Sequence, residues 1–502
     1  MIRTKRAKLK ACEREMREAQ SYEAWSEAAR THDDLSGMTR WKQMDQTHMY
    51  DHVAIRARLD RLRAHRARHD YHGLLFSLNE GIHGNIGGMG KASLHARARF
   101  GTKQLVQDYT YEICDALELI ANVDEAVIPF SEKLDFFKRA SHCYGRTALM
   151  LSGGGALGHF HAGVVQSLVE HDILPSIISG SSAGSINAAV IGCSTPAELQ
   201  RLFEPTHFAR EAAEEARFLD NILGHRTAQI DVHELEELVA RLVPDLTFAE
   251  AYARTGVSIN ISIAPAELQQ ASRLLNAITS PNVFVRKAVM ASCAVPGVFP
   301  AVSLAAKNVH GDSQPYLPSL KWIDGSVSDD LPAKRLGRLY GVNHYVASQI
   351  NPVVLPFIRD PGASDGLGSA AMGLVRSLAR ESIRSAQKSA QRYSRQLPRF
   401  NMLLSMATSI AVQTYTADIN IFPGFRYFDP TKLLSHLSES EVIELMMEGK
   451  RSTWPKIETI RVCTRISRTL DRIRRDFKQQ EHARLNGQAA PRHGSAKRRK
   501  AA

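Results

Sequence analysis

The feature that most constrains this chain is the stretch Gly180-Ser181-Ser182-Ala183-Gly184, a G-x-S-x-G sequence. A short apolar stretch precedes it and a helix-forming stretch of small residues follows it. In a strand–turn–helix of this kind, the serine stands at the apex of a tight turn with its hydroxyl accessible. Gly180 and Gly184 suit such an elbow because neighbouring backbone leaves little room for a Cβ atom. The pattern predicts an α/β fold with Ser182 as a nucleophile; the alternative is an ordinary Gly/Ser turn.

A glycine-rich loop, Ser152-Gly153-Gly154-Gly155-Ala156, comes before the serine turn. It follows a predicted strand over 148–151 and precedes a predicted helix over 161–170. Consecutive glycines allow backbone N–H groups to converge on an anion. Beside a nucleophilic serine, that anion is the tetrahedral intermediate. We therefore expect Gly153, Gly154 and Gly155 to supply an oxyanion hole. A nucleotide-binding loop is the alternative, but no Lys-Ser/Thr pair follows and the fit to G-x-G-x-x-G is imperfect.

A lone carboxylate, Asp324, stands far downstream in the step Ile323-Asp324-Gly325-Ser326. A carboxylate at a strand end, with glycine leaving space beside it, can take the serine proton directly. An isolated Asp-Gly is more often a plain turn, so this interpretation depends on the two preceding motifs. Neither His159 nor His161, beside the glycine loop, has a motif that identifies it as the base. The sequence thus predicts a Ser182/Asp324 dyad, with supporting roles for these histidines.

The chain also contains an H-x-x-x-x-D spacing, formed by His65 and Asp70, which is typical of some acyltransferases. With 20 histidines in the chain, about one such match is expected by chance. We therefore assign this pair no catalytic role.

The hydrophobic pattern divides the chain into a helical part and an α/β part. The 502 residues suggest more than one domain, and the hydrophobic content of 44% is enough for a sizeable core. Residues up to about 130 are charged and follow helical spacing. Beyond them, short apolar strands alternate with helices, and 257–263 alternates apolar and polar residues as a strand does. This order predicts an α/β sandwich with a largely parallel sheet.

The net charge of +12 is concentrated at the C-terminus. Residues 461–502 hold 13 Lys/Arg and three acids, which gives +10 and leaves about +2 for the rest. A lipid surface, nucleic acid or a purely solubilising role would each suit such a segment. Nucleic acid is the weakest of these, because no aromatic or groove-reading module accompanies the charge.

The cysteines and the apolar stretches bear on the cellular compartment of the protein and on its need for a metal or cofactor. The six cysteines are scattered without a C-x-x-C pair, so they suggest neither a zinc site nor a disulfide framework. We expect no metal and no cofactor. A reducing cytoplasm is the simplest interpretation. The basic N-terminus lacks an apolar stretch, so we expect no signal peptide. The uncharged stretch 288–306 is interrupted by Pro296 and Pro300, and we interpret it as buried strand and loop.

In this order, the glycine loop, serine turn and Asp-Gly resemble those of the patatin-like phospholipases, and in particular the fungal and plant triacylglycerol-lipase branch. The resemblance covers roughly residues 20–475. Stretches that support it in the α/β part are 274–283, 291–299, 324–332, 342–344 and 453–456. Stretches that support it in the helical part are 22–25, 41–42, 87–88 and 101–103.

The resemblance implies a three-layer α/β/α sandwich with a mainly parallel sheet, preceded by a mostly helical N-terminal domain. The implied divisions are an accessory domain over 1–130, a patatin-like catalytic core over 131–355, its C-terminal extension over 356–475, and a basic disordered tail over 476–502.

The resemblance also implies a lipid acyl hydrolase that cleaves acylglycerols or phospholipids through an acyl-enzyme. Ser182 would be its nucleophile, Asp324 its base, and Gly153, Gly154 and Gly155 its oxyanion hole. Many patatins place a basic residue two positions after the glycines, where this chain has Leu157. The alternatives are an acyltransferase that uses the same acyl-enzyme and an inactive lipid-surface scaffold.

Access to a lipid substrate implies peripheral contact with a membrane or lipid surface. A candidate for this contact is a basic stripe with a spacing of four residues, for which a solvated helix face is an equally good interpretation. Its members are Arg376, Arg380, Arg384, Lys388 and Arg392.

Overall fold

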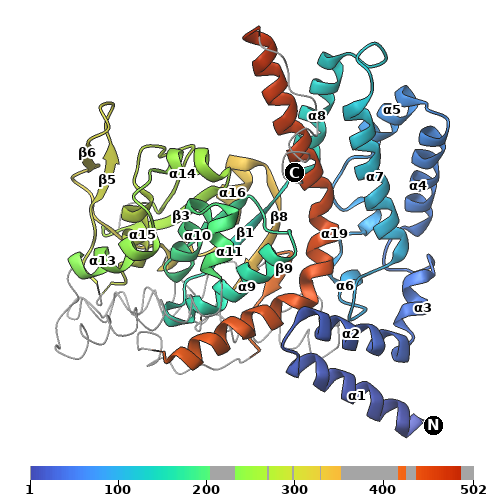
Figure 1. Ribbon diagram of the computed structural model, residues 1–502, viewed down its shortest axis with the longest axis horizontal. Coiled ribbons are helices and arrows are strands. Elements are labelled where there is room, and N and C mark those ends of the chain that lie inside the picture. The colour runs from blue at the N-terminus through green and yellow to red at the C-terminus, as the bar shows by residue number, and fades with distance from the viewer. Residues whose placement is uncertain are drawn as a thin grey trace, which may run out of the picture.

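The computed structural model describes residues 2–203, 232–267, 271–296, 299–327, 329–351, 417–424 and 437–487. An α/β core and a group of N-terminal helices lie side by side, and the long helix α19 (Glu439–Leu485) runs between them (Figure 1). The Arg376–Arg392 stripe lies outside the described residues.

The core is built on a mixed sheet with strand order β4-β3-β2-β1-β8-β9, in which β7 also pairs with β3. Strands β3, β2, β1, β8 and β9 run parallel to one another, whereas β4 and β7 are antiparallel to β3. The mainly parallel sheet predicted from the sequence is therefore confirmed. The strands are β1 Arg146–Leu151, β2 Ile177–Gly180, β3 Ser258–Pro265, β4 Arg273–Asn276, β7 Trp322–Asp324, β8 Val342–Ser348 and β9 Ile419–Ile421.

Both faces of this sheet are buried, because side chains alternate between two apolar cores. On β1, Leu149 and Leu151 join the larger core, while Ala148 and Met150 join a smaller one. The larger core includes residues of α9 (Gly158–Glu170), α10 (Ala183–Cys193), α14 (Phe248–Thr255) and α15 (Val285–Cys293); the smaller one includes Leu336 of α16 (Ala333–Tyr340). Helix α11 (Pro196–Leu202), helix α13 (Val232–Leu242) and the hairpin β5 (Leu304–Lys307)–β6 (Ser313–Tyr316) complete this part.

The polar side chains of β3 are buried although they alternate with apolar ones. Ser258, Asn260 and Ser262 are all below a tenth exposed. The Asn260 amide donates to the carbonyl of Ile178 at 3.2 Å and accepts from the Tyr340 hydroxyl at 3.1 Å. A period-two pattern, which usually indicates one wet face, here accompanies polar side chains that are buried. Asn260 finds its partners inside the protein, whereas the Ser262 hydroxyl has no hydrogen-bond partner among the described residues.

The N-terminal region forms a second, helical core of its own, as the sequence predicts. Its helices are α1 Ile2–Glu18, α2 Tyr22–Ser36, α3 Met38–Gln43, α4 His52–Ala67, α5 Tyr71–Gly81, α6 Ala92–His95, α7 Gln104–Asn122 and α8 Phe130–Tyr144. Helix α8 extends past the expected boundary at 130 because Phe136 and Phe137 are fully buried in this core. Helices α1 and α2 instead contribute Met16 and Trp25 to the core of the α/β part.

Helix α19 joins the two cores. Its first part packs Val442 and Met446 into the core of the α/β part, and its later part packs Ile466 and Phe477 among the N-terminal helices. Pro455 lies inside the helix, which bends in Figure 1, as expected of a residue without an N–H. The helix continues to Leu485, so the predicted start of a disordered tail at 476 lies within it.

The interpretation of 288–306 as strand and loop is wrong for its first part. Residues 285–293 form helix α15, and a strand begins only at Leu304. Seven of the nine residues of this helix are buried, so its sequence lacks the amphipathic period of a surface helix. Without that period, a helix and a strand cannot be told apart from a short apolar run. Over the described ranges, none of the helices is long and apolar enough to cross a membrane.

Candidate active site

Ser182 stands at a strained turn between β2 and α10. Its backbone has φ 49° and ψ −126°, a region that L-residues rarely adopt and that marks functional turns. A Cβ on Gly180 would lie 2.1 Å from the carbonyl oxygen of Gly184, and one on Gly184 would lie 2.2 Å from that of Leu151. Both predicted elbow glycines are therefore required by close backbone packing.

Ser292 on α15 forms a hydrogen bond with this elbow. The N–H of Ser182 donates to Ser292 Oγ at 3.0 Å, and the Ser292 hydroxyl donates to the carbonyl of Ser262 on β3 at 2.7 Å. The Ser185 hydroxyl donates to the Ser182 carbonyl at 2.6 Å. Ser292 was not among the predicted site residues, because a serine in an apolar stretch carries no motif.

Asp324 lies at the end of β7 and is almost completely buried. Burial raises the pKa of its carboxyl from 3.8 to about 6, and hydrogen bonds from the Ser326 backbone and from the Ser182 and Ser326 side chains offset part of this rise. The Ser326 N–H donates to Oδ1 at 2.8 Å. A Cβ on Gly325 would lie 2.1 Å from the Ser262 carbonyl oxygen, so only glycine fits here. The fold thus places the Ser182 hydroxyl close enough to the Asp324 carboxyl to affect its pKa.

The glycine loop passes beside the elbow. A Cβ on Gly153 would lie 3.2 Å from Ser182 Cβ, one on Gly154 would lie 2.6 Å from Ile350 Cγ1, and Gly155 has a φ of 55°. The three positions therefore need glycine for close approach or for backbone conformation.

From the sequence, we expect the N–H of Gly153 to bind the oxyanion. In the structure it donates instead to Asp330 Oδ1 at 2.8 Å. Within the described ranges, no acceptor is assigned to the N–H groups of Gly154 and Gly155. Of the three predicted oxyanion-hole donors, these two remain available to a ligand.

Asp330 is a second buried carboxylate at this site, and the sequence-based prediction missed it as a functional residue. It is fully buried, and it accepts hydrogen bonds from Gly153 and from the Ser181 hydroxyl. Burial raises its pKa to about 6; hydrogen bonds from Ser181, Gly153 and Asn351 offset part of this rise, and the charge of Asp324 adds a smaller upward contribution. An Asp-Leu-Pro sequence ahead of a helix is typical of a helix N-terminus. This local interpretation gives no indication that Asp330 makes long-range contacts.

His161 supports the site without being placed to act as a base. It is fully buried, with Nε2 2.8 Å from the Ser152 carbonyl oxygen and Nδ1 2.7 Å from Ser348 Oγ. Because a carbonyl only accepts, Nε2 carries the proton and Nδ1 accepts from Ser348. Burial lowers the pKa of His161 to about 4, so the ring is neutral at neutral pH. Burial likewise lowers the pKa of His159 to about 4.

The His65–Asp70 pair lies far from the elbow, in the region of α4 and α5 (Figure 1). The two side chains are 2.8 Å apart, and Asp70 also accepts from the Gly73 N–H at the start of α5. This arrangement is a helix N-cap.

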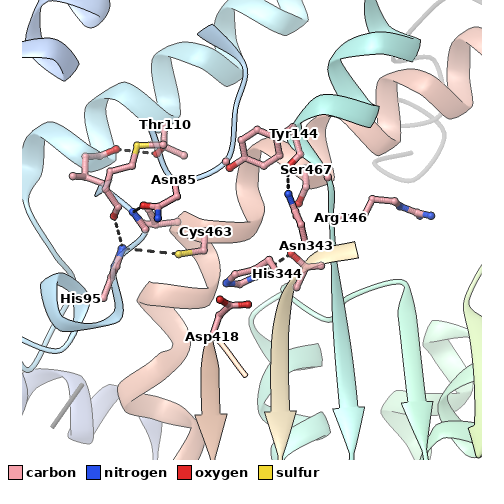
Figure 2. Close-up of a pocket in the computed structure, with 17 residues that line it drawn as sticks. Asn85, His95, Thr110, Tyr144, Arg146, Asn343, His344, Asp418, Cys463 and Ser467 are labelled. Carbon is pink, nitrogen blue, oxygen red and sulfur yellow. Dashed lines mark hydrogen bonds between the residues drawn. The ribbon is translucent and has the colours of Figure 1, made fainter. Parts of the chain in front are cut away.

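A cavity of about 300 Å³ with a mixed polar and apolar lining lies at the other end of the sheet, between the N-terminal helices and strands β1, β8 and β9 (Figure 2). Its lining includes Thr147 near the start of β1 and His344 near the start of β8, whose side chains are 3.1 Å apart. Ser182 follows the carboxyl end of β2, which runs parallel to β1. This cavity is therefore separate from the Ser182 site. Among the described residues, no three or more His, Cys, Asp or Glu side chains are placed to hold a metal ion.

A mainly parallel sheet with a glycine loop after β1 and a serine elbow after β2 is the framework of a patatin-type α/β protein. Comparison with known families agrees with this class. Residues 149–336 match the family "Patatin-like phospholipase", and residues 2–142 match "Domain of unknown function (DUF3336)".

Similar proteins extend over nearly the whole chain. Triacylglycerol lipase ptl3 of Schizosaccharomyces pombe is 32% identical over 89% of this chain and 93% of its own length. Triacylglycerol lipase SDP1L of Arabidopsis thaliana is 32% identical over 91% of the chain, and triacylglycerol lipase 4 of Saccharomyces cerevisiae is 33% identical over 88%. The chain spans only 57% and 50% of these two longer relatives. The chain belongs to the patatin-like phospholipase family, in the branch that carries this N-terminal domain.

Proposed function

We propose that this protein hydrolyses carboxylic esters of acylglycerols through a Ser182/Asp324 dyad. The observation that carries the proposal is the position of Ser182, at the apex of a strained elbow, beside Asp324, a buried carboxylate whose pKa burial raises to about 6 and the nearby Ser182 hydroxyl lowers in part. A carboxylate with a pKa near the working pH can both accept and return a proton.

The proposed reaction has two steps. Ser182 Oγ attacks the ester carbonyl carbon while Asp324 accepts its proton, and the N–H groups of Gly154 and Gly155 face the developing oxyanion. When the tetrahedral intermediate collapses, Asp324 returns the proton to the departing alcohol and an acyl-enzyme remains. A water molecule, deprotonated by Asp324, then attacks the acyl carbonyl, and Asp324 returns the proton to Ser182 Oγ as the bond to the serine breaks and the fatty acid is released. Apart from the substrate and this water molecule, each step uses only residues of the chain.

The substrate class follows from the three relatives described above, all of which are named triacylglycerol lipases. We extend this class to the present chain and keep phospholipids and lysophospholipids as competing substrates, because the matched family is described by phospholipase activity.

We also propose peripheral contact with a lipid surface, which an enzyme acting on lipids requires. The arginines of α19 contribute less to such contact than their number suggests. Arg468 pairs with Asp172, Arg472 with Glu118 and Arg484 with Glu125. The positive charge that α19 would offer to anionic headgroups is thus partly neutralised within the protein.

The test is fatty-acid release from emulsified triacylglycerol, diacylglycerol, phospholipid and lysophospholipid by the wild type, Ser182→Ala and Asp324→Asn. Release that is lost in both variants, while both retain wild-type circular dichroism, supports the dyad, and the best substrate identifies the lipid class. Release that persists in Ser182→Ala would refute it. Acyl transfer to an added monoacylglycerol that outpaces hydrolysis would instead favour the acyltransferase alternative.

A further inference from the structure

We propose that Asp330 is a positioning residue that holds the glycine loop and the serine elbow in register for acyl transfer. The inference rests on the function proposed above, and it assigns to this carboxylate a role beyond the dyad and the oxyanion hole.

The evidence is a set of three contacts that converge on one side chain. Asp330 Oδ1 accepts from the Gly153 N–H at 2.8 Å and from the Ser181 hydroxyl. Its Oδ2 lies 3.4 Å from Asn351 Nδ2. The three donors come from the segments that follow β1, β2 and β8, which are neighbouring strands of the sheet. One buried carboxylate therefore ties together three loops at the same edge.

Two of these donors lie next to reacting groups. Gly153 immediately precedes the two glycines whose N–H groups face the oxyanion, and Ser181 immediately precedes the nucleophile. A single oxygen atom, Asp330 Oδ1, thus fixes the spacing between the oxyanion hole and Ser182. A misplacement of about 1 Å between reacting groups can lower a rate by about 10²-fold.

A carboxylate suits this task better than an amide would. All three donors are uncharged, and hydrogen bonds to an ionised acceptor are shorter and about twice as strong as neutral ones. An asparagine at position 330 would keep one acceptor oxygen and lose the charge, whereas a leucine would keep neither. The two substitutions therefore weaken the hydrogen bonds to different degrees while keeping the side chain at a similar size.

Burying this carboxylate opposes its ionisation, as the raised pKa indicates. Its neighbour in sequence has a different environment. Asp329 is partly exposed and pairs with Arg335 at 3.1 Å, which is an ordinary ion pair next to solvent. Asp329→Asn is therefore a matched control that removes an adjacent charge without touching the three loops.

The test compares kcat and KM for a short-chain soluble ester in the wild type, Asp330→Asn, Asp330→Leu and Asp329→Asn, together with hydrogen exchange in the peptide 150–158. We expect kcat per folded molecule to fall about tenfold in Asp330→Asn and about 10³-fold in Asp330→Leu, with KM within about twofold of wild type. Exchange in 150–158 is expected to become faster in both variants, and Asp329→Asn is expected to match the wild type.

A purely structural role would lower thermal stability without changing kcat per folded molecule, and that result would overturn the proposal. If Asp330→Leu does not fold, Asp330→Asn decides, because a kcat within twofold of wild type would also overturn it. A wild type that cleaves no ester defeats the proposed function instead, and the exchange measurement then still shows whether Asp330 holds the glycine loop.

Discussion

Gly163 of α9 and Gly449 of α19 lie against each other where the two helices cross. A Cβ on Gly449 would lie 3.2 Å from Gly163 Cα and 2.2 Å from the carbonyl oxygen of Phe160. A Cβ on Gly163 would lie 1.9 Å from the carbonyl oxygen of Met446. The two backbones therefore touch, and this contact fixes α19 against α9, the helix that follows the glycine loop.

The first prediction concerns this crossing. Gly163→Ala or Gly449→Ala forces the helices apart, because the new methyl group meets backbone that cannot rotate away. We expect each variant to lose at least about 2 kcal/mol of unfolding free energy, as for an overpacked core. Urea denaturation measures the loss. Gly81→Ala is the control, since its methyl would meet only the end of the Arg58 side chain at 2.7 Å; equal stability of all three variants would contradict the crossing.

The second prediction is the pH dependence of ester cleavage. Asp324 acts as a base only when ionised, and burial raises its pKa to about 6. Activity should therefore rise with pH through about 6, about two units above the range of an ordinary aspartate. The measurement is kcat/KM from pH 4.5 to 9 on a soluble ester, with circular dichroism to confirm folding. A profile that is flat down to pH 4.5 would be inconsistent with Asp324 as the base.

The third prediction is that Asp324→Asn stabilises the protein in a pH-dependent way. A carboxyl whose pKa is raised on folding contributes stability below its unfolded pKa of about 3.8, and this contribution is lost as pH rises through about 6. The wild type should thus lose up to about 3 kcal/mol above pH 7 through this group. We expect Asp324→Asn to melt at a higher temperature than the wild type at pH 8, and the two to converge at pH 4. A wild type that melts at a higher temperature than Asp324→Asn at pH 8 would disprove this prediction.

The fourth prediction separates a supporting histidine from a catalytic one. His161→Phe removes two buried hydrogen bonds and leaves the Ser152 carbonyl and the Ser348 hydroxyl without this partner. The loss of stability should be about 2–4 kcal/mol, measured by thermal denaturation. The midpoint of the pH–rate profile should stay near 6, since His161 is neutral throughout this range. His65→Ala, at the exposed pair, should change neither property; a shifted midpoint in His161→Phe would point to a histidine base instead.

Local sequence rules were sufficient for the strand–turn–helix around Ser182 and for the class of fold. The turn is specified by glycines whose Cβ atoms would strike backbone only a few residues away or on the adjacent strand, and the α/β pattern follows from short-range periodicity. The mainly parallel sheet and the helical N-terminal region are confirmed. The catalytic roles of Ser182 and Asp324 stay predictions, although the fold brings the two side chains close together.

What the sequence by itself determined is therefore what depends on neighbouring residues: the elbow, the glycine loop and the alternation of strands and helices. Only the tertiary structure decided how α19 divides its packing between two cores, and which atoms surround the dyad. Asp330 lies 149 residues from Ser181 and 177 from Gly153, and no periodicity or motif encodes contacts over such separations. These contacts exist because the carboxyl ends of parallel strands lie at one edge of the sheet, where loops that are distant in sequence meet. A carboxylate buried there is out of contact with water and is stabilised by hydrogen-bond donors from those loops.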